Sequence, residues 1–285
     1  MSDGYLAKIG RRSLALAACA AFLAACAKEV PKHLEPLSYH VQRDLLLLGL
    51  KAESPIMLRI FKEDSELEVW KQNGSGQYAL FRTYPICKWS GEFGPKLEEG
   101  DKQAPEGFYT IKPGQMNPWS NYYLSFNLGY PNRYDQSYDR TGAYLMVRGA
   151  CSSAGCYSMT DEYIADIFAL AREAFDGGQE AFQVQAYPFR MTEENMARFA
   201  DNPWYPFWQN LKEGYDAFER DKVPPKVTVC GQRYLFNMAF DIPDENKIDP
   251  KRPCPAGEQI LPPGLSVAAS PVLNPLISGS DIAGQ

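Results

Sequence analysis

The sequence predicts an α+β fold in which a mainly β domain carries appended helices. Three short segments with strand composition follow one another early in the chain: Ile56 to Phe61, Glu66 to Lys71 and Tyr78 to Tyr84. The stretches that join them, residues 63–65 and 73–76, have turn compositions typical of an antiparallel meander. The second half of the chain changes to a period near 3.6 residues, which indicates helices.

Further strands are expected at Phe108 to Ile111, Tyr122 to Phe126 and Ala143 to Val147, between loops rich in Gly, Pro, Asn and Asp. Two late segments, Val227 to Cys230 and Tyr234 to Phe236, are expected to return to the sheet.

The strongest helix signal begins at Thr160, whose side chain can cap a helix. Asp161 and Glu162 then fall in the first turn, where the helix dipole favours negative charge. Five apolar side chains share one face at helical spacing before Gly177 and Gly178 end the helix: Ile164, Ile167, Phe168, Ala171 and Phe175.

Three other helices are expected, at Val41 to Leu50, Thr192 to Ala200 and Trp204 to Phe218. The last of these carries an apolar stripe typical of core packing: Phe207, Trp208, Leu211, Tyr215 and Phe218.

The length after the leader suits one large domain or two small ones. Hydrophobic residues make up 45% of the chain, which is enough for a substantial core. The net charge of −6, without a basic stripe, argues against a nucleic-acid partner. We expect a tether and leading helix at 26–52, a catalytic domain at 53–238 and a proline-rich, flexible tail at 239–285.

The N-terminus predicts export. Lys8, Arg11 and Arg12 precede an apolar run, residues 13–25, that is too short to span a bilayer and is typical of a secretory signal peptide at 1–25. The run ends in Leu-Ala-Ala-Cys26, which resembles a bacterial lipobox, although an ordinary signal with an incidental cysteine stays an alternative. Lipidation at Cys26 would hold the domain on a membrane. Ala27 then favours the outer membrane and hence a periplasmic location.

Five cysteines remain after the leader: Cys87, Cys151, Cys156, Cys230 and Cys254. An exported protein lies in an oxidising compartment, so some of them can pair, and the odd number leaves at least one free. Cys230 with Cys254 is one plausible bridge. The cysteine spacing and the scarcity of histidine predict no metal site.

The segment from Ala143 to Thr160 carries the candidate chemistry. An apolar strand leads into Arg148 and Gly149, a small-residue loop follows, and Cys156 lies just ahead of the predicted helix. Small residues at 152–155 can let a substrate approach and can leave backbone N–H groups for an oxyanion, while the helix start favours a thiolate. From these residues alone, a glycine-rich turn around a buried structural cysteine fits equally well.

This segment resembles the active-site signature of the YkuD-type L,D-transpeptidases, in particular their YafK-like branch, with its S-x-G-C followed by an aromatic residue and M-T-D. Other stretches agree with the same branch in order along the chain: Tyr84-Pro85-Ile86-Cys87, Ser90-Gly91, Gly94-Pro95-Lys96-Leu97, Gly100 to Gly107, Asn117-Pro118, Leu124 to Asn127, Gly129-Tyr130-Pro131 and Pro188 to Met191. The resemblance covers Ile56 to Asn237. It implies a YkuD-like β sandwich or barrel with flanking helices, Cys156 as the nucleophile, peptidoglycan stem peptides containing diaminopimelate as partners, and no cofactor.

One position departs from the branch. Arg148 stands where the histidine that pairs with the thiol is usual, and the only histidines, His33 and His40, precede the domain. Arginine cannot accept a proton, because it loses its own only above about pH 12. A guanidinium within about 4 Å of the sulfur would instead favour the thiolate. Proton transfer would then fall to water or to a tyrosine: Tyr109, Tyr130, Tyr144 or Tyr157.

The resemblance also implies a set of residues near the thiol. Those expected to bind substrate or the oxyanion are Gly149, Ser153, Gly155, Tyr157, Tyr109 and Tyr130. A polar cluster of Asp101, Gln103 and Glu106 either contacts substrate or forms an exposed turn.

Three functions stay open at this stage. The first is an L,D-transpeptidase that crosslinks stem peptides through a Cys156 thioester, with linkage of L-alanine to diaminopimelate suggested by arginine-bearing relatives. The second is an amidase that releases wall-attached lipoprotein from peptidoglycan. The third is an inactive lipoprotein that binds peptidoglycan.

Overall fold

The structure is a computed structural model and describes residues 30–262 of the 285-residue chain. The chain divides into two compact units, residues 1–35 and residues 36–285. In the first unit, the described residues include one short 3-10 helix, Lys32–Leu34. The expected signal peptide and Cys26 lie outside the described residues, and all elements below belong to the second unit.

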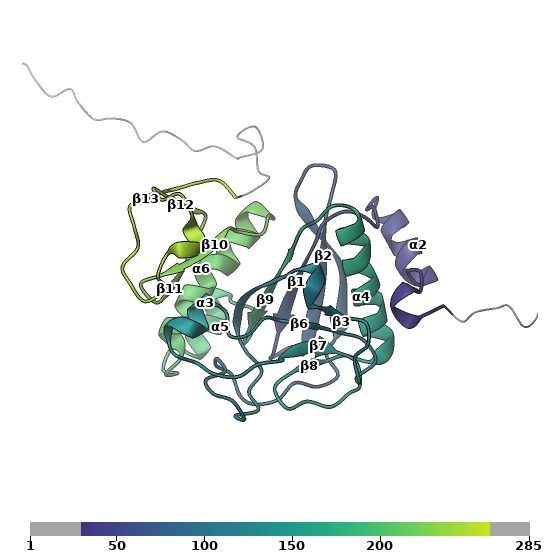
Figure 1. Ribbon diagram of the computed structural model, residues 1–285, viewed down its shortest axis with the longest axis horizontal. Coiled ribbons are helices and arrows are strands. Elements are labelled where there is room, and N and C mark those ends of the chain that lie inside the picture. Colours follow the sequence, from purple (N-terminus) through teal and green to yellow (C-terminus); the bar gives the residue numbers. More distant parts are fainter. Residues whose placement is uncertain (1–29, 263–285) are drawn as a thin grey trace, which may run out of the picture. The chain divides into compact units, whose positions relative to one another are not determined.

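A five-stranded sheet forms the centre of the second unit, in the order β3-β2-β1-β9-β4 (Figure 1). Its strands are β1 (Ile56–Phe61), β2 (Glu66–Gln72), β3 (Tyr78–Pro85), β4 (Gly107–Ile111) and β9 (Phe182–Tyr187). β1 runs parallel to β9, with Leu58 opposite Val184, and every other pair is antiparallel. The predicted meander is confirmed as β1, β2 and β3.

β1 is buried along its whole length because both faces of the sheet are covered. Successive side chains of a strand point to opposite faces. Ile56, Leu58 and Ile60 therefore enter one hydrophobic core, while Phe61 enters a second core on the other face. Figure 1 shows α4 and α6 on opposite sides of this sheet.

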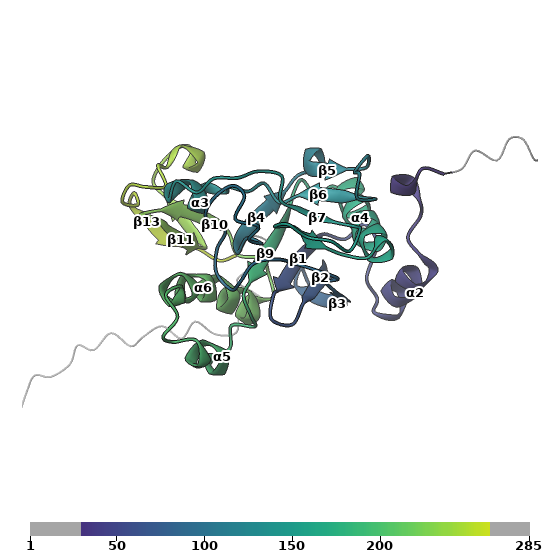
Figure 2. The ribbon, with the colours of Figure 1, turned by 90° about the horizontal axis from the view of Figure 1, so that it is seen from below.

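The first face is covered by α4 (Asp161–Asp176), by α2 (Tyr39–Leu47) and by a second sheet. The second sheet contains β5 (Met116–Asn117), β6 (Ser125–Asn127), β7 (Met146–Arg148) and β8 (Tyr157–Ser158), in that order, and Figure 2 shows β5, β6 and β7 side by side. A short 3-10 helix, Pro113–Gln115, precedes β5. As expected, the Thr160 side chain caps α4 by accepting a hydrogen bond from the Tyr163 N–H at 3.2 Å.

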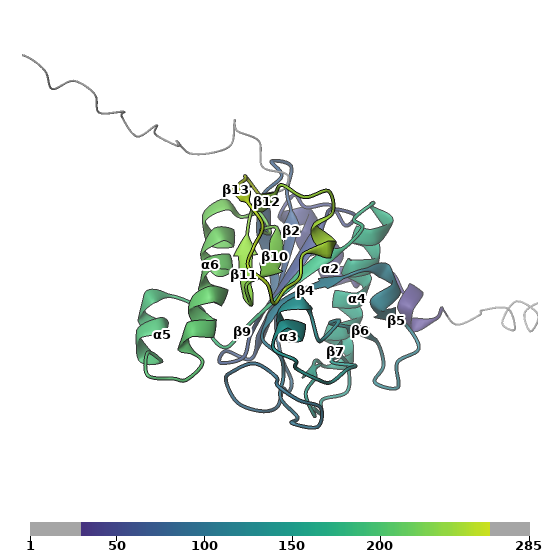
Figure 3. The same cartoon turned by 60° about the vertical axis from the view of Figure 1, so that its left-hand side comes forward.

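The second face is covered by α6 (Tyr205–Asp221), whose predicted apolar stripe is buried in full. α5 (Glu193–Arg198) and α3 (Arg133–Ser137) lie on the same side, together with β10 (Val227–Cys230) and β11 (Arg233–Phe236). Figure 3 shows α5, α6 and this pair of strands together.

One expectation about strands is wrong, and one strand was not predicted. β10 and β11 do not return to the main sheet, because they pair with each other as a separate antiparallel hairpin. The strand that does enter the sheet is β9, which the sequence analysis did not assign.

The expected flexible tail has defined structure up to residue 262. β12 (Met238–Phe240) pairs with β13 (Gly257–Gln259), a 3-10 helix spans Glu245–Lys247, and Ile248 is buried. The structure also pairs Cys230 with Cys254, the bridge that the sequence suggested. Residues 263–285 lie outside the described part. Within residues 30–262, no helix is both long enough and apolar enough to cross a membrane.

A fully buried ion pair joins Lys62, directly after β1, to Glu106, directly before β4. The same carboxylate also contacts α6. The ammonium of Lys62 lies 2.8 Å from Glu106, and both side chains are 0% exposed. Glu106 also accepts hydrogen bonds from the Gly94 N–H at 2.7 Å and from the Trp208 indole at 2.9 Å. Burial lowers the pKa of Lys62, and the Glu106 carboxylate counteracts this shift. Glu106 was expected either to contact substrate or to lie in an exposed turn; instead, it is part of the core.

Glu106→Ala is expected to lower the free energy of unfolding by about 3–5 kcal/mol, because it leaves the Lys62 ammonium buried without its counter-ion. Urea unfolding measures this loss. The matched control is Asp216→Ala, which breaks an ion pair with Lys212 in which Asp216 is 51% exposed, and it should cost less than about 0.5 kcal/mol. Equal losses in the two variants would contradict the assignment.

Candidate active site

The candidate nucleophile lies at the end of a loop between two neighbouring strands. Residues 149–156 leave β7 and return to β8, which runs parallel to it with Arg148 opposite Ser158. The Met159 N–H donates to the Arg148 carbonyl at 2.7 Å, so both ends of the loop are fixed to each other. Cys156 is partly exposed at the point where the chain enters β8.

Cys156 is the one free cysteine among the described residues. Cys87 pairs with Cys151, with 5.4 Å between their Cα atoms, and Cys230 pairs with Cys254. The first bridge was not predicted, since its partners are 64 residues apart. It connects the segment after β3 to the middle of the loop, and thereby holds the loop five residues before the thiol.

Arg148 holds the same loop from within. Its Nη1 donates to the carbonyls of Gly149 at 2.9 Å and Ala150 at 3.0 Å, and its Nη2 donates to the carbonyl of Ser152. The guanidinium also stacks on the ring of Tyr122, 3.7 Å from the centroid, and the side chain is buried. These contacts make Arg148 a positioning residue for the loop; its electrostatic influence on the thiol stays a prediction.

A group of serine hydroxyls fixes the residues next to Cys156. Ser153 donates to the Cys156 carbonyl at 2.7 Å, and Ser90 accepts from the Gly155 N–H at 2.7 Å. The two hydroxyls lie 3.1 Å apart, and Ser90 also donates to the Lys102 carbonyl. Ser90 was recognised only as part of a family motif, so its contact with the loop is a functional role that the sequence analysis missed.

The two glycines of the loop do not have the role expected of them. The Gly155 N–H is engaged by Ser90, and the Gly149 N–H donates to the Leu124 carbonyl at 3.1 Å, so neither is available to an oxyanion in this conformation. Gly149 is required for packing instead, because a Cβ there would lie 2.5 Å from the Asp161 carboxylate. Gly155 is required for its backbone conformation, with φ at +115°.

The first turn of α4 reaches back to the loop. The Asp161 carboxylate accepts a hydrogen bond from the Ala150 N–H at 2.9 Å. Ala150 itself has φ at +55°, a conformation that non-glycine residues rarely adopt. The loop is therefore held by a guanidinium, a disulfide and a carboxylate, and its strained residue lies among these three contacts.

The three tyrosines expected near the substrate are core residues. Tyr109, Tyr130 and Tyr157 are all buried, and their hydroxyls donate to the carbonyls of Glu106, Lys96 and Pro105, respectively. Burial raises the pKa of each hydroxyl. Substrate contact and proton transfer by these side chains are therefore excluded in this conformation, whereas Tyr144 is 77% exposed.

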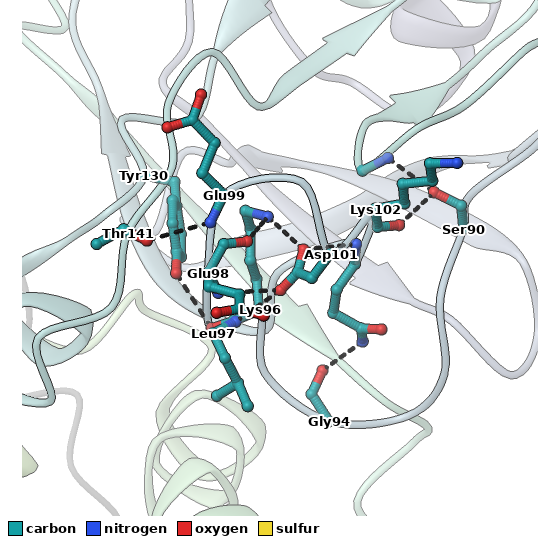
Figure 4. Close-up of polar contacts among 12 residues, drawn as sticks. Ser90, Gly94, Lys96, Leu97, Glu98, Glu99, Asp101, Lys102, Tyr130 and Thr141 are labelled. Atoms are coloured by element: carbon teal, nitrogen blue, oxygen red, sulfur yellow. Dashed lines mark hydrogen bonds and ion pairs between the residues drawn. The ribbon is translucent and has the colours of Figure 1, made fainter.

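The loop from Gly91 to Ala104 packs against the nucleophile loop and is itself held by Asp101. The Asp101 carboxylate accepts hydrogen bonds from the N–H groups of Leu97 and Gln103, both at 2.9 Å, and from the Lys96 ammonium (Figure 4). Burial opposes ionisation of Asp101, but these donors outweigh it and lower its pKa. Asp101 and Gln103 thus shape the loop, since the Gln103 side chain bonds the backbone of Glu92 and Gly94.

The described residues offer no metal site. Within residues 30–262, no group of three or more His, Cys, Asp or Glu side chains is placed to hold an ion.

The site consists of a free, partly exposed thiol at the end of a fixed loop of small residues. It defines a protein whose candidate nucleophile is a single cysteine. The chain matches no family model. It is 45% identical over 184 residues to the protein named "Putative L,D-transpeptidase YafK" of Escherichia coli K12, and to the protein of the same name in strain O157:H7. The match covers 65% of this chain and 74% of each relative. The chain belongs to the L,D-transpeptidase family.

Two solved structures show weaker likeness. The cell shape determining protein Pgp2 of Campylobacter jejuni, as its K307A mutant, is 18% identical with a TM-score of 0.39, over 68% of this chain and 66% of that one. Bd1075 of Bdellovibrio bacteriovorus is 20% identical with a TM-score of 0.31, over 66% and 67%. At these TM-scores the structures add nothing to the family assignment.

Arg148→Ala is expected to loosen the loop and to slow the alkylation of Cys156, because three loop carbonyls lose their donor and the nearby chain loses a positive charge. Iodoacetamide kinetics measure the alkylation rate, and hydrogen exchange of residues 149–156 measures how firmly the loop is held.

Arg133→Ala provides the matched control, since Arg133 likewise donates to two backbone carbonyls, those of Asn246 and Ile248, in the C-terminal region. It should leave both readouts of the Cys156 loop unchanged. An unchanged alkylation rate in Arg148→Ala would show that Arg148 does not influence the thiol, and unchanged exchange would show that it does not hold the loop.

Proposed function

We propose that the protein is a peptidoglycan L,D-transpeptidase that joins stem peptides through a thioester on Cys156. The observation that carries this proposal is the free thiol in a family member whose other four cysteines in the described domain are paired. An exported domain that pairs four cysteines and keeps the fifth reduced and partly exposed has a chemical use for it.

In the first step, the Cys156 thiolate attacks the carbonyl carbon of an L-configured residue in the donor stem. A carbon–sulfur bond forms, the amide carbon–nitrogen bond breaks, and the departing amine takes up a proton. In the second step, an amine of the acceptor stem attacks the thioester, loses a proton and releases the thiolate. The thioester conserves the free energy of the broken amide, so no ATP is consumed.

The protons are carried by water in this proposal. Arg148 cannot accept a proton near neutral pH. Tyr109, Tyr130 and Tyr157 are buried and donate their hydroxyl protons to carbonyls. Cys156 is in contact with solvent, so a water molecule can reach both the sulfur and the departing amine.

The chemical identity of the acceptor is the most specific part of the proposal. Arginine in the histidine position suggests a crosslink between L-alanine of one stem and diaminopimelate of another. Water in place of the acceptor amine would give hydrolysis through the same thioester.

Cys156→Ala is expected to abolish product formation from purified stem-peptide muropeptides, because the bond to carbon cannot form. Mass spectrometry of the products is the measurement, with crosslinked dimers expected from the wild type. The matched control is the double variant Cys230→Ser with Cys254→Ser, which removes the distant disulfide. Its rate of dimer formation should stay within about threefold of the wild-type rate.

Three results would contradict the proposal. Dimers formed by Cys156→Ala would show that the thiol is not the nucleophile. Released peptides without dimers in the wild type would make the protein an amidase, and no product at all would make it a peptidoglycan-binding protein.

We further propose that the mature protein is lipidated on Cys26 and faces the periplasm from the outer membrane. The support is the apolar run that ends in Leu-Ala-Ala-Cys26 and the alanine that follows it. Several acyl chains, at about 0.8 kcal/mol per buried methylene, hold a soluble domain on a bilayer.

Cys26→Ala is expected to lose metabolic labelling by radioactive palmitate and to leave the membrane fraction, because the attachment sulfur is missing. The matched control is Cys19→Ala, which alters a cysteine inside the apolar run and should keep both label and membrane association. Label retained by Cys26→Ala would overturn the lipid anchor.

A further inference from the structure

A concave site lies on the α6 side of the domain. It has a volume of about 610 Å³ and is lined by α3 with the residues after it, by the start of α6, by the turn of the β10–β11 hairpin and by Leu97. Tyr134 and Phe207 are buried in its floor, and Tyr138 is 46% exposed at its wall. Aromatic walls with a few polar groups are typical of sites for small organic ligands.

A buried arginine lies among these rings. The Arg140 guanidinium carbon is 5.2 Å from the ring centroids of both Tyr134 and Tyr138, and the residue is 8% exposed. Its Nη1 donates to Asp135 at 2.8 Å, but its Nε has no hydrogen-bond partner within the described part of the chain. A buried donor without an acceptor costs free energy, which an acceptor oxygen from a ligand would recover after a small adjustment of the floor.

The charges of the site are already balanced. Arg140 pairs with Asp135, and Arg233 at the rim pairs with Glu213 at 2.5 Å. A ligand that brought its own charge would have to displace one of these carboxylates. The lining therefore fits an uncharged molecule with an apolar face and several hydroxyl or amide oxygens, which is the chemistry of a neutral sugar ring.

We propose that this pocket binds one neutral N-acetylated sugar ring of a peptidoglycan glycan strand, with the ring packed against Tyr138 and its oxygens toward the floor and rim. This inference rests on the proposed function, because it assumes that the substrate of Cys156 is attached to a glycan. Tyrosine suits this use, since its ring offers an apolar surface while its hydroxyl is fixed by the Gln232 carbonyl at 3.0 Å.

One loop connects the pocket to the nucleophile. Leu97 lines the pocket, and the same loop continues through Asp101 to Lys102, whose carbonyl accepts from Ser90 (Figure 4). Ser90 in turn holds the Gly155 N–H next to Cys156. The Leu97 carbonyl also accepts a hydrogen bond from the Thr141 N–H, which fixes this wall of the pocket to the residues after α3. A sugar bound there would lie against the same loop that contacts the residue next to Cys156.

The probe is peptide-free chitotetraose, titrated against the full chain by intrinsic tryptophan fluorescence and by saturation-transfer NMR. Tyr138→Ala is expected to weaken binding about tenfold, a change of about 1.4 kcal/mol. Tyr138→Phe keeps the ring and should bind as the wild type does. Tyr39→Ala, which removes a tyrosine 74% exposed on α2, is the matched control and should also bind as the wild type does.

A second measurement separates this inference from the proposed function. The ratio of kcat/KM on sugar-linked stems to kcat/KM on free stem peptides should fall about tenfold in Tyr138→Ala at unchanged Tm. Absence of chitotetraose binding, or equal binding by the wild type and Tyr138→Ala, would overturn the sugar site even if turnover is normal. If the sugar binds but neither substrate is turned over, the sugar site is supported and the proposed function is contradicted.

Discussion

The conformation of the nucleophile loop depends on three backbone carbonyls that share one guanidinium. Carbonyl oxygens that point into the same small space repel one another, and the buried cation of Arg148 removes that repulsion. A planar group with five donors can do this, whereas an imidazole has two nitrogens and cannot bond three carbonyls at once. In this chain, the position that usually supplies proton chemistry supplies loop geometry instead.

That exchange of roles has a chemical consequence for the site. The histidine usual at this position is replaced by an arginine that bonds the loop backbone, and Tyr109, Tyr130 and Tyr157 are engaged in the core. The remaining structure compensates with rigidity: the Cys87–Cys151 bridge, the Asp161 carboxylate and the serine pair all hold the same eight residues. The site is therefore organised around the fixed position of the loop.

Local periodicity was sufficient for much of the fold. The turn-separated strands β1 to β3 and the apolar stripes of α4 and α6 are formed where the sequence predicts them. β9 was not predicted, although Phe182, Val184 and Ala186 alternate with more polar residues. This alternation is typical of a strand. The hairpin β10–β11 was assigned to the wrong sheet, because a strand's pattern does not specify its partner.

The site was predictable to a similar extent. The motif located Cys156, but the functions of its neighbours depend on groups far away in sequence. Gly149 is needed because Asp161 and Tyr122 approach it, and Tyr157 is in the core because its hydroxyl bonds the Pro105 carbonyl. No spacing within the 149–157 segment contains that information.

The parallel pairing of β1 with β9 sets the order in which this domain can assemble. During synthesis, β1 is made first and can pair with β2 as soon as the meander is complete. Its other edge stays unpaired until β9, more than a hundred residues further along the chain, has been made. Such non-local pairing is slow, because loop-closure entropy is lost before the contact is gained. Until β9 arrives, β1 presents an open edge to which β9 will later pair. An unpaired strand edge of this kind exposes backbone donors and acceptors to other chains during folding, which is a source of aggregation.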